Sequence, residues 1–209
     1  MPCHVAGHFI PPMTNTKPQS RRALRQSLRA KRNALSAGQQ SEAARLLSEQ
    51  IQSIITRPNS TVAGYLANDG EIDLTSTIKA CQQNGVVTLP VLHPFTGKHL
   101  LFQTFTEQTK MTLNRFGISE PAPNSTAIRL LSQHQLLLMP LVGFDAQGNR
   151  LGMGGGFYDR TLANINTLDN RPTLVGVAHD CQQVDELPIE PWDVPLDLIV
   201  TPTQIISTR

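Results

Sequence analysis

Apolar residues recur at helical spacing in the first part of the chain. Leu24 and Leu28 lie four residues apart with an arginine-rich face opposite them, which predicts a helix from about residue 20. Ser36 and Gln39 have the spacing of a capping box, which predicts the start of a second helix. Its apolar positions keep the helical spacing: Ala43, Leu46, Leu47, Ile51, Ile54 and Ile55.

Short apolar and β-branched runs predict strands in the rest of the chain. They are residues 61–66, 86–89, 100–105, 135–142, 173–178, 198–201 and 204–207. We expect Pro90 to end the second run. Helices are predicted between the runs, from a cap at Asp73 to a stop at Gly85, and over residues 154–165. This alternation predicts a three-layer α/β/α fold with a mostly parallel central sheet.

Residues 1–19 carry four prolines and little apolar periodicity, so we expect them to form a disordered N-terminal extension. Residues 20–209 have the length of a single α/β catalytic domain. No apolar stretch reaches the roughly 18–20 residues that a membrane span needs. Three cysteines, Cys3, Cys81 and Cys181, match neither a zinc site nor a redox pair, which favours reduced thiols in a cytoplasmic protein.

Charge is distributed unevenly around a net value of +2. No acidic residue precedes Glu42, and the basic residues before it are Lys17, Arg21, Arg22, Arg25, Arg29, Lys31 and Arg32. Such a segment favours a polyanionic partner, and both a small phosphate ligand and a nucleic acid fit it. The predicted helix carries no aromatic residue, so nucleic-acid binding is the second hypothesis.

Gly152 and the run 154–156 precede a predicted helix, where backbone N–H groups can approach a phosphate. The segment lacks the GK[ST] of a P-loop, and Phe157 replaces the last glycine of a dinucleotide motif. A glycine turn without a ligand is the alternative. The flanking residues Arg150, Asp159 and Arg160 favour the phosphate site.

Several acidic residues are candidates for binding. Asp159, about one turn inside the predicted helix, suits Mg²⁺ coordination, although a surface ion pair with Arg160 or other nearby cations is the commoner role of a single Asp. Asp193 lies between two prolines, and two roles fit it: a second metal-binding carboxylate or a turn-capping residue. Glu71 can accept hydrogen bonds from a ligand, and His179 is as compatible with a structural role as with a functional one.

Five segments together resemble the 5-formyltetrahydrofolate cyclo-ligase family, also called 5,10-methenyltetrahydrofolate synthetases. The most specific is residues 139–160, MPLVGFDAQGNRLGMGGGFYDR, and the others are 21–25, 64–73, 117–121 and 177–182 with 191–193. The resemblance covers residues 21 to about 206. It implies the fold of the NagB/RpiA/CoA-transferase-like proteins.

The resemblance also implies functional residues. ATP would be contacted by Arg21, Arg22, Ala23, Leu24, Arg25, Arg150, Leu151, Gly152, Met153, Gly154, Gly155, Gly156, Phe157 and Tyr158. The folate would be contacted by Leu66, Glu71, Met153, Gly154, Gly155, Gly156 and Phe157. Mg²⁺ would be held by Asp159 and Asp193, and Arg150 and Tyr158 are the candidate catalytic residues.

The implied reaction converts 5-formyltetrahydrofolate to 5,10-methenyltetrahydrofolate while ATP is cleaved to ADP and phosphate. We expect a cytoplasmic, monomeric enzyme with Mg²⁺ as cofactor, ATP as co-substrate, and neither nucleic-acid nor membrane partners. Two alternatives come from other classes. One is a nucleic-acid-binding module built on the arginine-rich helix. The other is a sugar-phosphate isomerase or acyl-CoA-type transferase, which would need a carboxylate base and no ATP.

Overall fold

The computed structural model describes residues 20–208, so the extension predicted over residues 1–19 lies outside the described residues. The helices are α1 (Arg21–Asn33), α2 (Ala37–Ile54), α3 (Thr75–Asn84) and α4 (Phe157–Leu162). The single 3-10 turns are η1 (Ser125–Ala127), η2 (Leu131–Gln133), η3 (Ile165–Thr167) and η4 (Asp180–Gln182). The strands are β1 (Ser60–Ala63), β2 (Gly85–Leu92), β3 (Leu100–Thr104), β4 (Met111–Leu113), β5 (Ser119–Pro121), β6 (Ile128–Arg129), β7 (Leu136–Pro140), β8 (Gly143–Phe144), β9 (Arg150–Leu151), β10 (Thr173–Val177), β11 (Leu198–Val200) and β12 (Ile205–Ser207).

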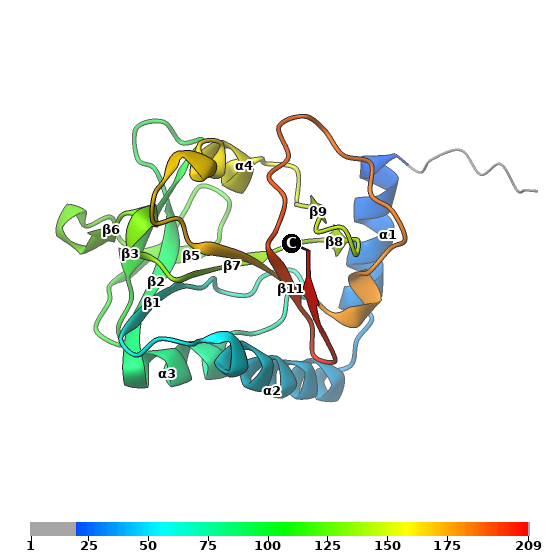
Figure 1. The fold of residues 1–209 in the computed structure, drawn as a ribbon, viewed down its shortest axis with the longest axis horizontal. Coiled ribbons are helices and arrows are strands. Elements are labelled where there is room, and N and C mark those ends of the chain that lie inside the picture. The colour runs from blue at the N-terminus through cyan, green and yellow to red at the C-terminus, as the bar shows by residue number, and fades with distance from the viewer. Residues whose placement is uncertain (1–19, 209) are drawn as a thin grey trace, which may run out of the picture.

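An eight-stranded sheet forms the centre of the molecule (Figure 1), in the order β12-β11-β10-β7-β1-β2-β3-β6. The five inner strands, from β11 to β2, pair in parallel. β12 at one edge and β3 and β6 at the other pair antiparallel. The prediction of an α/β fold with a mostly parallel sheet is therefore confirmed. None of the helices within residues 20–208 is long and apolar enough to span a membrane.

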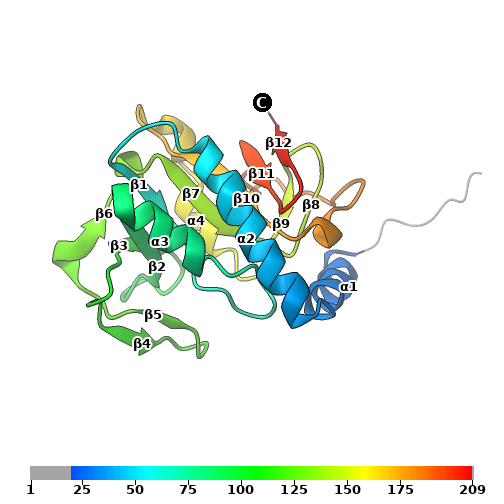
Figure 2. The same cartoon turned by 90° about the horizontal axis from the view of Figure 1, so that it is seen from below.

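Helices lie on both sides of this sheet. α2 and α3 pack side by side across one face (Figure 2), and α4 lies on the other (Figure 1). β7 shows how the sequence supports this arrangement. Leu136 and Leu138 pack into the core beneath α2 and α3, and Leu137 and Met139 pack into the core on the α4 side. A strand buried on both faces requires the uninterrupted apolar run that the sequence has here.

The structure tests three predicted helix signals, at the start of α2 and at the two ends of α3. Ser36 and Gln39 form both hydrogen bonds of the capping box at the start of α2. The cap predicted at Asp73 is one residue too early, because the N-cap of α3 is Leu74, which makes no side-chain cap hydrogen bond. The Asp73 carboxylate still accepts a hydrogen bond from the Thr75 backbone N–H at 2.8 Å. α3 ends at Gly85, as expected, but Gly85 does not have the left-handed conformation that commonly ends a helix. The φ angle of Gly85 is −177°, and a Cβ would lie 2.2 Å from the Ser60 carbonyl oxygen, so glycine permits the close approach of β1.

Two expectations about element lengths are wrong. β2 continues through Pro90 because β1 pairs with β2 only as far as Thr88, so no ladder hydrogen bond is lost at the proline. The helix predicted over residues 154–165 is limited to α4. Gly154 and Gly156 have φ angles of 99° and 63°, which a right-handed helix does not contain.

Candidate active site

Loops that follow three parallel strands meet at one edge of the sheet. β1, β7 and β10 run in the same direction, so residues 64–73, 141–156 and 178–187 all follow their carboxyl ends. α1 lies at this edge, where it contacts β8 and η4 (Figure 1). Ligands bind outside the carboxyl ends of strands in open parallel sheets. The structure therefore brings the segments that carry Glu71, the glycine run and His179 to the edge of the sheet where a ligand is expected.

The glycine-rich segment is an exposed loop between β9 and α4. The Arg25 Nε donates a hydrogen bond to the Gly152 carbonyl at 2.8 Å, and the Arg25 guanidinium lies next to Gly154. The left-handed conformations of Gly154 and Gly156 keep the loop backbone open to an approaching anion. Because α4 has only six residues, the positive potential here comes from the arginines and the loop amides.

Three other predicted ATP contacts in α1 are Arg22, Ala23 and Leu24. Leu24 packs with Leu151 and Leu187 in a small core cluster. Leu24 and Leu151 were both predicted to contact ATP, and their side chains are instead buried in the protein. Arg22 is exposed to solvent and Ala23 is half-buried.

Arg21 and Asp193 form a two-pronged ion pair. Arg21 Nη1 and Nη2 donate to Asp193 Oδ2 and Oδ1 at 2.5 and 3.1 Å. The Glu190 backbone N–H donates to Asp193 Oδ2 at 2.9 Å. Burial opposes the charge of Asp193. The hydrogen bonds from Arg21 and from the Glu190 backbone N–H, together with the charges of Arg21 and Arg150, outweigh burial and lower the pKa of this carboxyl. Asp193 therefore remains ionised and joins the 188–195 loop to α1.

A second pair joins Arg150 and Asp159. Arg150 is buried, and its Nη2 donates to Asp159 Oδ1, while the guanidinium lies 5.8 Å from the centre of the Tyr158 ring. Among the described residues, neither Arg150 Nε nor the buried Tyr158 hydroxyl has a hydrogen-bond partner. Burial raises the pKa of Tyr158, so the hydroxyl stays protonated. Unpartnered buried donors of this kind are available to ligand oxygens.

Asp159 and Asp193 line one cavity of about 660 Å³, together with Gly154, Gly156, Arg160, Leu162, Ala163, Ile165, Asn166, Pro191, Trp192, Val194 and Pro195. No group of three metal-ligating side chains occurs within residues 20–208. Mg²⁺ is commonly bound by one or two protein carboxylates together with waters and substrate phosphates. The donor set present, two carboxyl groups on the wall of one cavity, fits such an ion.

The candidate folate residues are Glu71 and Leu66, which follow β1, together with residues 153–157 of the glycine loop. Glu71 Oε2 accepts a hydrogen bond from the Asn68 backbone N–H at 3.1 Å, and the Glu71 side chain is only 12% exposed. Burial raises the pKa of Glu71 to about 7. Leu66 is half-buried against the core, and Met153 is exposed. Phe157 packs edge-to-face on Phe116 at 5.7 Å.

Sequence reasoning did not select Arg32 as a site residue. Its side chain is fully buried, with Nη2 lying 4.0 Å from Glu71 Oε1 and 3.9 Å from Met153 Sδ. A signal was present, because Arg32 follows Arg21 by three turns and so lies on the same helix face.

His179 is buried beside Gly70, and its Nε2 has no hydrogen-bond partner among the described residues.

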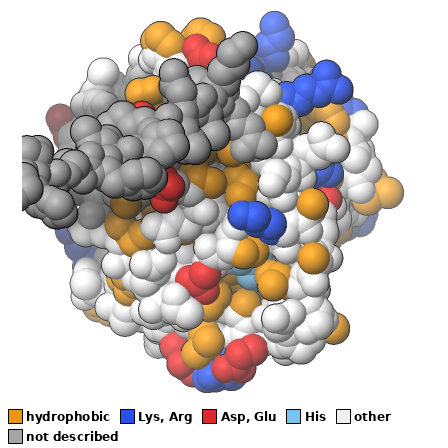
Figure 3. Space-filling model, turned by 90° about the vertical axis from the view of Figure 1, so that its right-hand side faces the viewer, with side chains coloured by type: hydrophobic (Ala, Val, Ile, Leu, Met, Phe, Trp, Pro, Cys, Tyr) orange, Lys and Arg blue, Asp and Glu red, His pale blue; other side chains and the backbone are white. Residues whose placement is uncertain are grey.

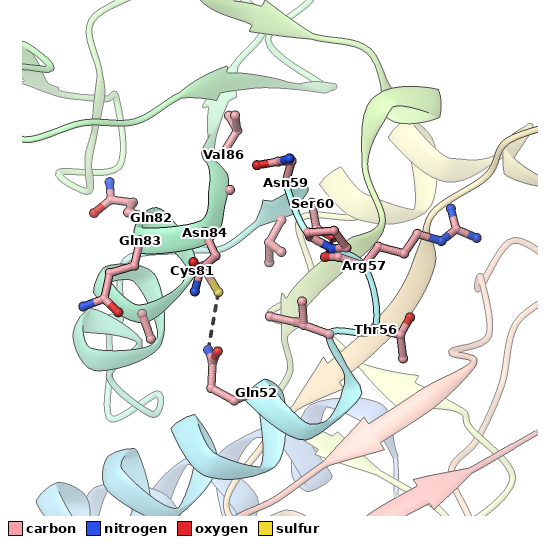
Figure 4. Close-up of a pocket in the computed structure, with 15 residues that line it drawn as sticks. Gln52, Thr56, Arg57, Asn59, Ser60, Cys81, Gln82, Gln83, Asn84 and Val86 are labelled. Carbon is pink, nitrogen blue, oxygen red and sulfur yellow. Dashed lines mark hydrogen bonds between the residues drawn. The ribbon is translucent and has the colours of Figure 1, made fainter.

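A second cavity of about 610 Å³ lies at the opposite edge of the sheet, between the ends of α2 and α3 and the starts of β1 and β2 (Figure 4). Cys81 lies inside it, where Gln52 Nε2 contacts the thiol at 3.8 Å. Burial raises the pKa of the Cys81 thiol, which therefore stays protonated. None of the predicted site residues lines this cavity, so it is separate from the candidate active site.

Fold and site together define an α/β enzyme with an arginine-rich, glycine-lined site at the carboxyl edge of its sheet. The sequence model of the 5-formyltetrahydrofolate cyclo-ligase family matches residues 17–202, and the chain belongs to this family.

Individual relatives agree with this assignment. The 5-formyltetrahydrofolate cyclo-ligase of Haemophilus influenzae is 45% identical over 185 residues, which cover 87% of this chain and 98% of that protein. The cyclo-ligase of Escherichia coli K12 is 43% identical over 183 residues, covering 85% and 98%. The structure of Aquifex aeolicus 5,10-methenyltetrahydrofolate synthetase matches with a TM-score of 0.75 at 26% identity, covering 90% of this chain and 93% of that one.

Proposed function

We propose that this chain cyclises 5-formyltetrahydrofolate to 5,10-methenyltetrahydrofolate and cleaves ATP to ADP and phosphate. The observation that carries the proposal is that arginines and a buried carboxylate meet at the glycine loop. Arg25 donates to the Gly152 carbonyl, and Arg32, which lies 4.0 Å from Glu71, also contacts Met153 of the loop. A transfer between a nucleotide and a folate requires the two substrates to meet across one short segment.

The arginines supply the nucleotide side. Arg21, Arg25 and Arg150 place three cationic groups around the loop, and its amides add donors for phosphate oxygens. The backbone of residues 150–158 and the first turn of α1 then form the ATP site that the family resemblance implies. Glu71 and Leu66 with residues 153–157 form the folate site.

The chemistry follows from a poor leaving group. The oxygen of an N-formyl group cannot leave as hydroxide at neutral pH, so the γ-phosphoryl group is first transferred to it, giving an iminium phosphate and ADP. N10 then attacks the formyl carbon, loses its proton, and phosphate departs as the new C–N bond becomes part of the methenyl ring. Arg150, with an unpartnered Nε, and Tyr158, with an unpartnered hydroxyl, are placed to stabilise the transferring phosphoryl oxygens.

Asp159 and Asp193 are the proposed Mg²⁺ ligands. The ion, when bound, neutralises charge on the phosphates during transfer. The Arg21–Asp193 and Arg150–Asp159 ion pairs position these two side chains on the wall of the cavity. We further propose that residues 20–209 form one cytoplasmic, monomeric catalytic domain with the NagB/RpiA/CoA-transferase-like fold, and the thiols of Cys81 and Cys181, both free, support a reducing compartment.

The nucleic-acid alternative has weaker support. Arg21, Arg25 and Arg32 direct their guanidinium groups to Asp193, Gly152 and Asp69, so they face the protein. On the side of the molecule where α1 lies, the visible basic side chains are separated by hydrophobic and uncharged surface (Figure 3).

A direct assay tests the proposal. The purified protein is incubated with 5-formyltetrahydrofolate and Mg²⁺, with and without ATP, and the methenyl product is followed by its absorbance. Product should form only with ATP, and ADP should appear in equal amount. Product without ATP, or ATP cleavage without product, would contradict the proposed reaction.

A further inference from the structure

We infer that Arg32 is a positioning residue of the folate site, which fixes the turn that carries Glu71 and favours the ionised form of the Glu71 carboxylate. The inference rests on the proposed folate role of Glu71. Arg32 is the only buried arginine of α1, whose other buried residues are Leu24 and Leu28.

Arg32 joins two loops of the site through one guanidinium group. Its Nε donates to the Asp69 carbonyl at 2.8 Å, and its Nη2 donates to Asp69 Oδ2 at 2.9 Å. Its Nη1 donates to the Leu141 carbonyl, just after β7, at 3.0 Å. A planar guanidinium has its donors at fixed angles, so these three bonds set the position of the 68–71 turn relative to β7.

The turn lies directly against α1. A Cβ at Gly70 would be 2.1 Å from Asn33 Oδ1, and Gly70 has a φ angle of 76°, so the turn requires glycine at this position. Asn33 Nδ2 also donates to Asp69 Oδ1 at 3.2 Å. The location of Glu71, one residue further on, therefore depends on how α1 holds this turn.

Charged groups around Glu71 act in opposite directions. Burial raises the pKa of Glu71 most strongly. The hydrogen bond from the Asn68 backbone N–H and then the charge of Arg32 lower this pKa, and the charge of Asp69 raises it. Tyr65, which follows β1, and Tyr158 of α4 also face Glu71, and burial raises the pKa of both, so they remain neutral. Arg32 thus provides the cation that opposes the burial of Glu71.

This arrangement has a chemical consequence for folate binding. An ionised carboxylate accepts hydrogen bonds from amine and amide N–H groups more strongly than a protonated one does. With a pKa of about 7, Glu71 is close to the point where half of it is protonated at neutral pH. Loss of the Arg32 charge would leave most of it protonated and weaken the folate contact.

The test is the pH dependence of kcat/KM for 5-formyltetrahydrofolate at saturating ATP, over about pH 5.5 to 9. In the wild type, kcat/KM should rise with pH as Glu71 ionises. Arg32→Gln should move this rise upward by about one pH unit or more, as expected for a charge within 4–6 Å. Asp69→Asn should move it downward, since it removes the negative charge that opposes ionisation. Asn suits this position, because Asp69 has a φ angle of 52°.

Arg29→Gln is the matched control. Arg29 also donates to Asp69 Oδ2, at 2.7 Å, but its side chain is 45% exposed, and we expect its removal to leave the profile in place. An Arg32→Gln variant that lowers kcat/KM by the same factor at every pH would overturn the inference and leave only a packing role. If Arg32→Gln does not fold, Asp69→Asn decides the question, and an unshifted profile overturns the inference.

A third variant separates this inference from the proposed function. Glu71→Gln should remove the pH dependence and raise the folate KM. If the pH dependence and the folate KM are unchanged, Glu71 is not a folate contact and the proposed folate site is wrong. If Glu71→Gln behaves as expected but neither charge variant shifts the profile, only the role of Arg32 is wrong.

Discussion

Replacing Glu71 with Gln should stabilise the fold, and the gain should grow with pH. The Glu71 carboxyl has a pKa of about 7 in the folded protein, against an ordinary value of 4.5. Between these values the folded chain keeps a proton that the unfolded chain has lost, so the wild-type free energy of unfolding falls as the pH rises. At about 1.4 kcal/mol per pH unit, the difference between these two pKa values lowers the wild-type free energy of unfolding by about 3 kcal/mol above pH 7.

Urea unfolding at about pH 5 and about pH 8 measures this effect directly. The difference in unfolding free energy between Glu71→Gln and the wild type should increase by about 2.5 kcal/mol from the lower to the higher pH, because the carboxyl of the unfolded chain is already mostly ionised at pH 5. Glu107→Gln, at an exposed carboxylate, is the control and should show no such increase. A Glu71→Gln difference that is the same at both pH values would refute the argument that burial destabilises the ionised form.

Three further predictions concern the nucleotide side. Arg25→Ala should raise the KM for ATP and leave the folate KM unchanged, because Arg25 touches the glycine loop at the Gly152 carbonyl; equal effects on both would remove it from the ATP site. Gly156→Ala should cost about 1–3 kcal/mol from its positive φ and raise the ATP KM, as judged by thermal unfolding and steady-state kinetics. Gly117→Ala, at a positive φ with open space around it, should lose stability without an ATP defect. Asp159→Asn should lower kcat with partial recovery at high Mg²⁺, and a Mg²⁺ titration that superimposes on the wild type would contradict the metal assignment.

Local and periodic signals in the sequence predicted much of the fold. The apolar run in β7 indicated a strand buried on both faces, and the Ser36–Gln39 pattern located the start of α2. The paired strands β4–β5 and β8–β9 were not predicted, because segments of two or three residues are too short to show a period. Their pairing depends on contacts that a linear pattern does not contain.

Ion pairs in the site were the least predictable part. Asp159 was expected to pair with Arg160 or other nearby cations if it had no ligand, and the sequence does not say which cation. Adjacent helix residues point in different directions, which disfavours Arg160. Asp159 pairs with Arg150, and Arg160 donates to the Lys98 carbonyl. The contact between Arg32 and Glu71 joins residues far apart in the sequence, so only the packing of α1 on the turn after β1 reveals it.

The most direct test of the mechanism follows one oxygen atom. 5-Formyltetrahydrofolate labelled with ¹⁸O in its formyl group is converted by the enzyme with unlabelled ATP, and the inorganic phosphate released is examined by mass spectrometry. Transfer of the phosphoryl group to the formyl oxygen predicts one ¹⁸O atom in each phosphate formed. Unlabelled phosphate, with the ¹⁸O recovered in water, would contradict the proposed phosphorylated intermediate.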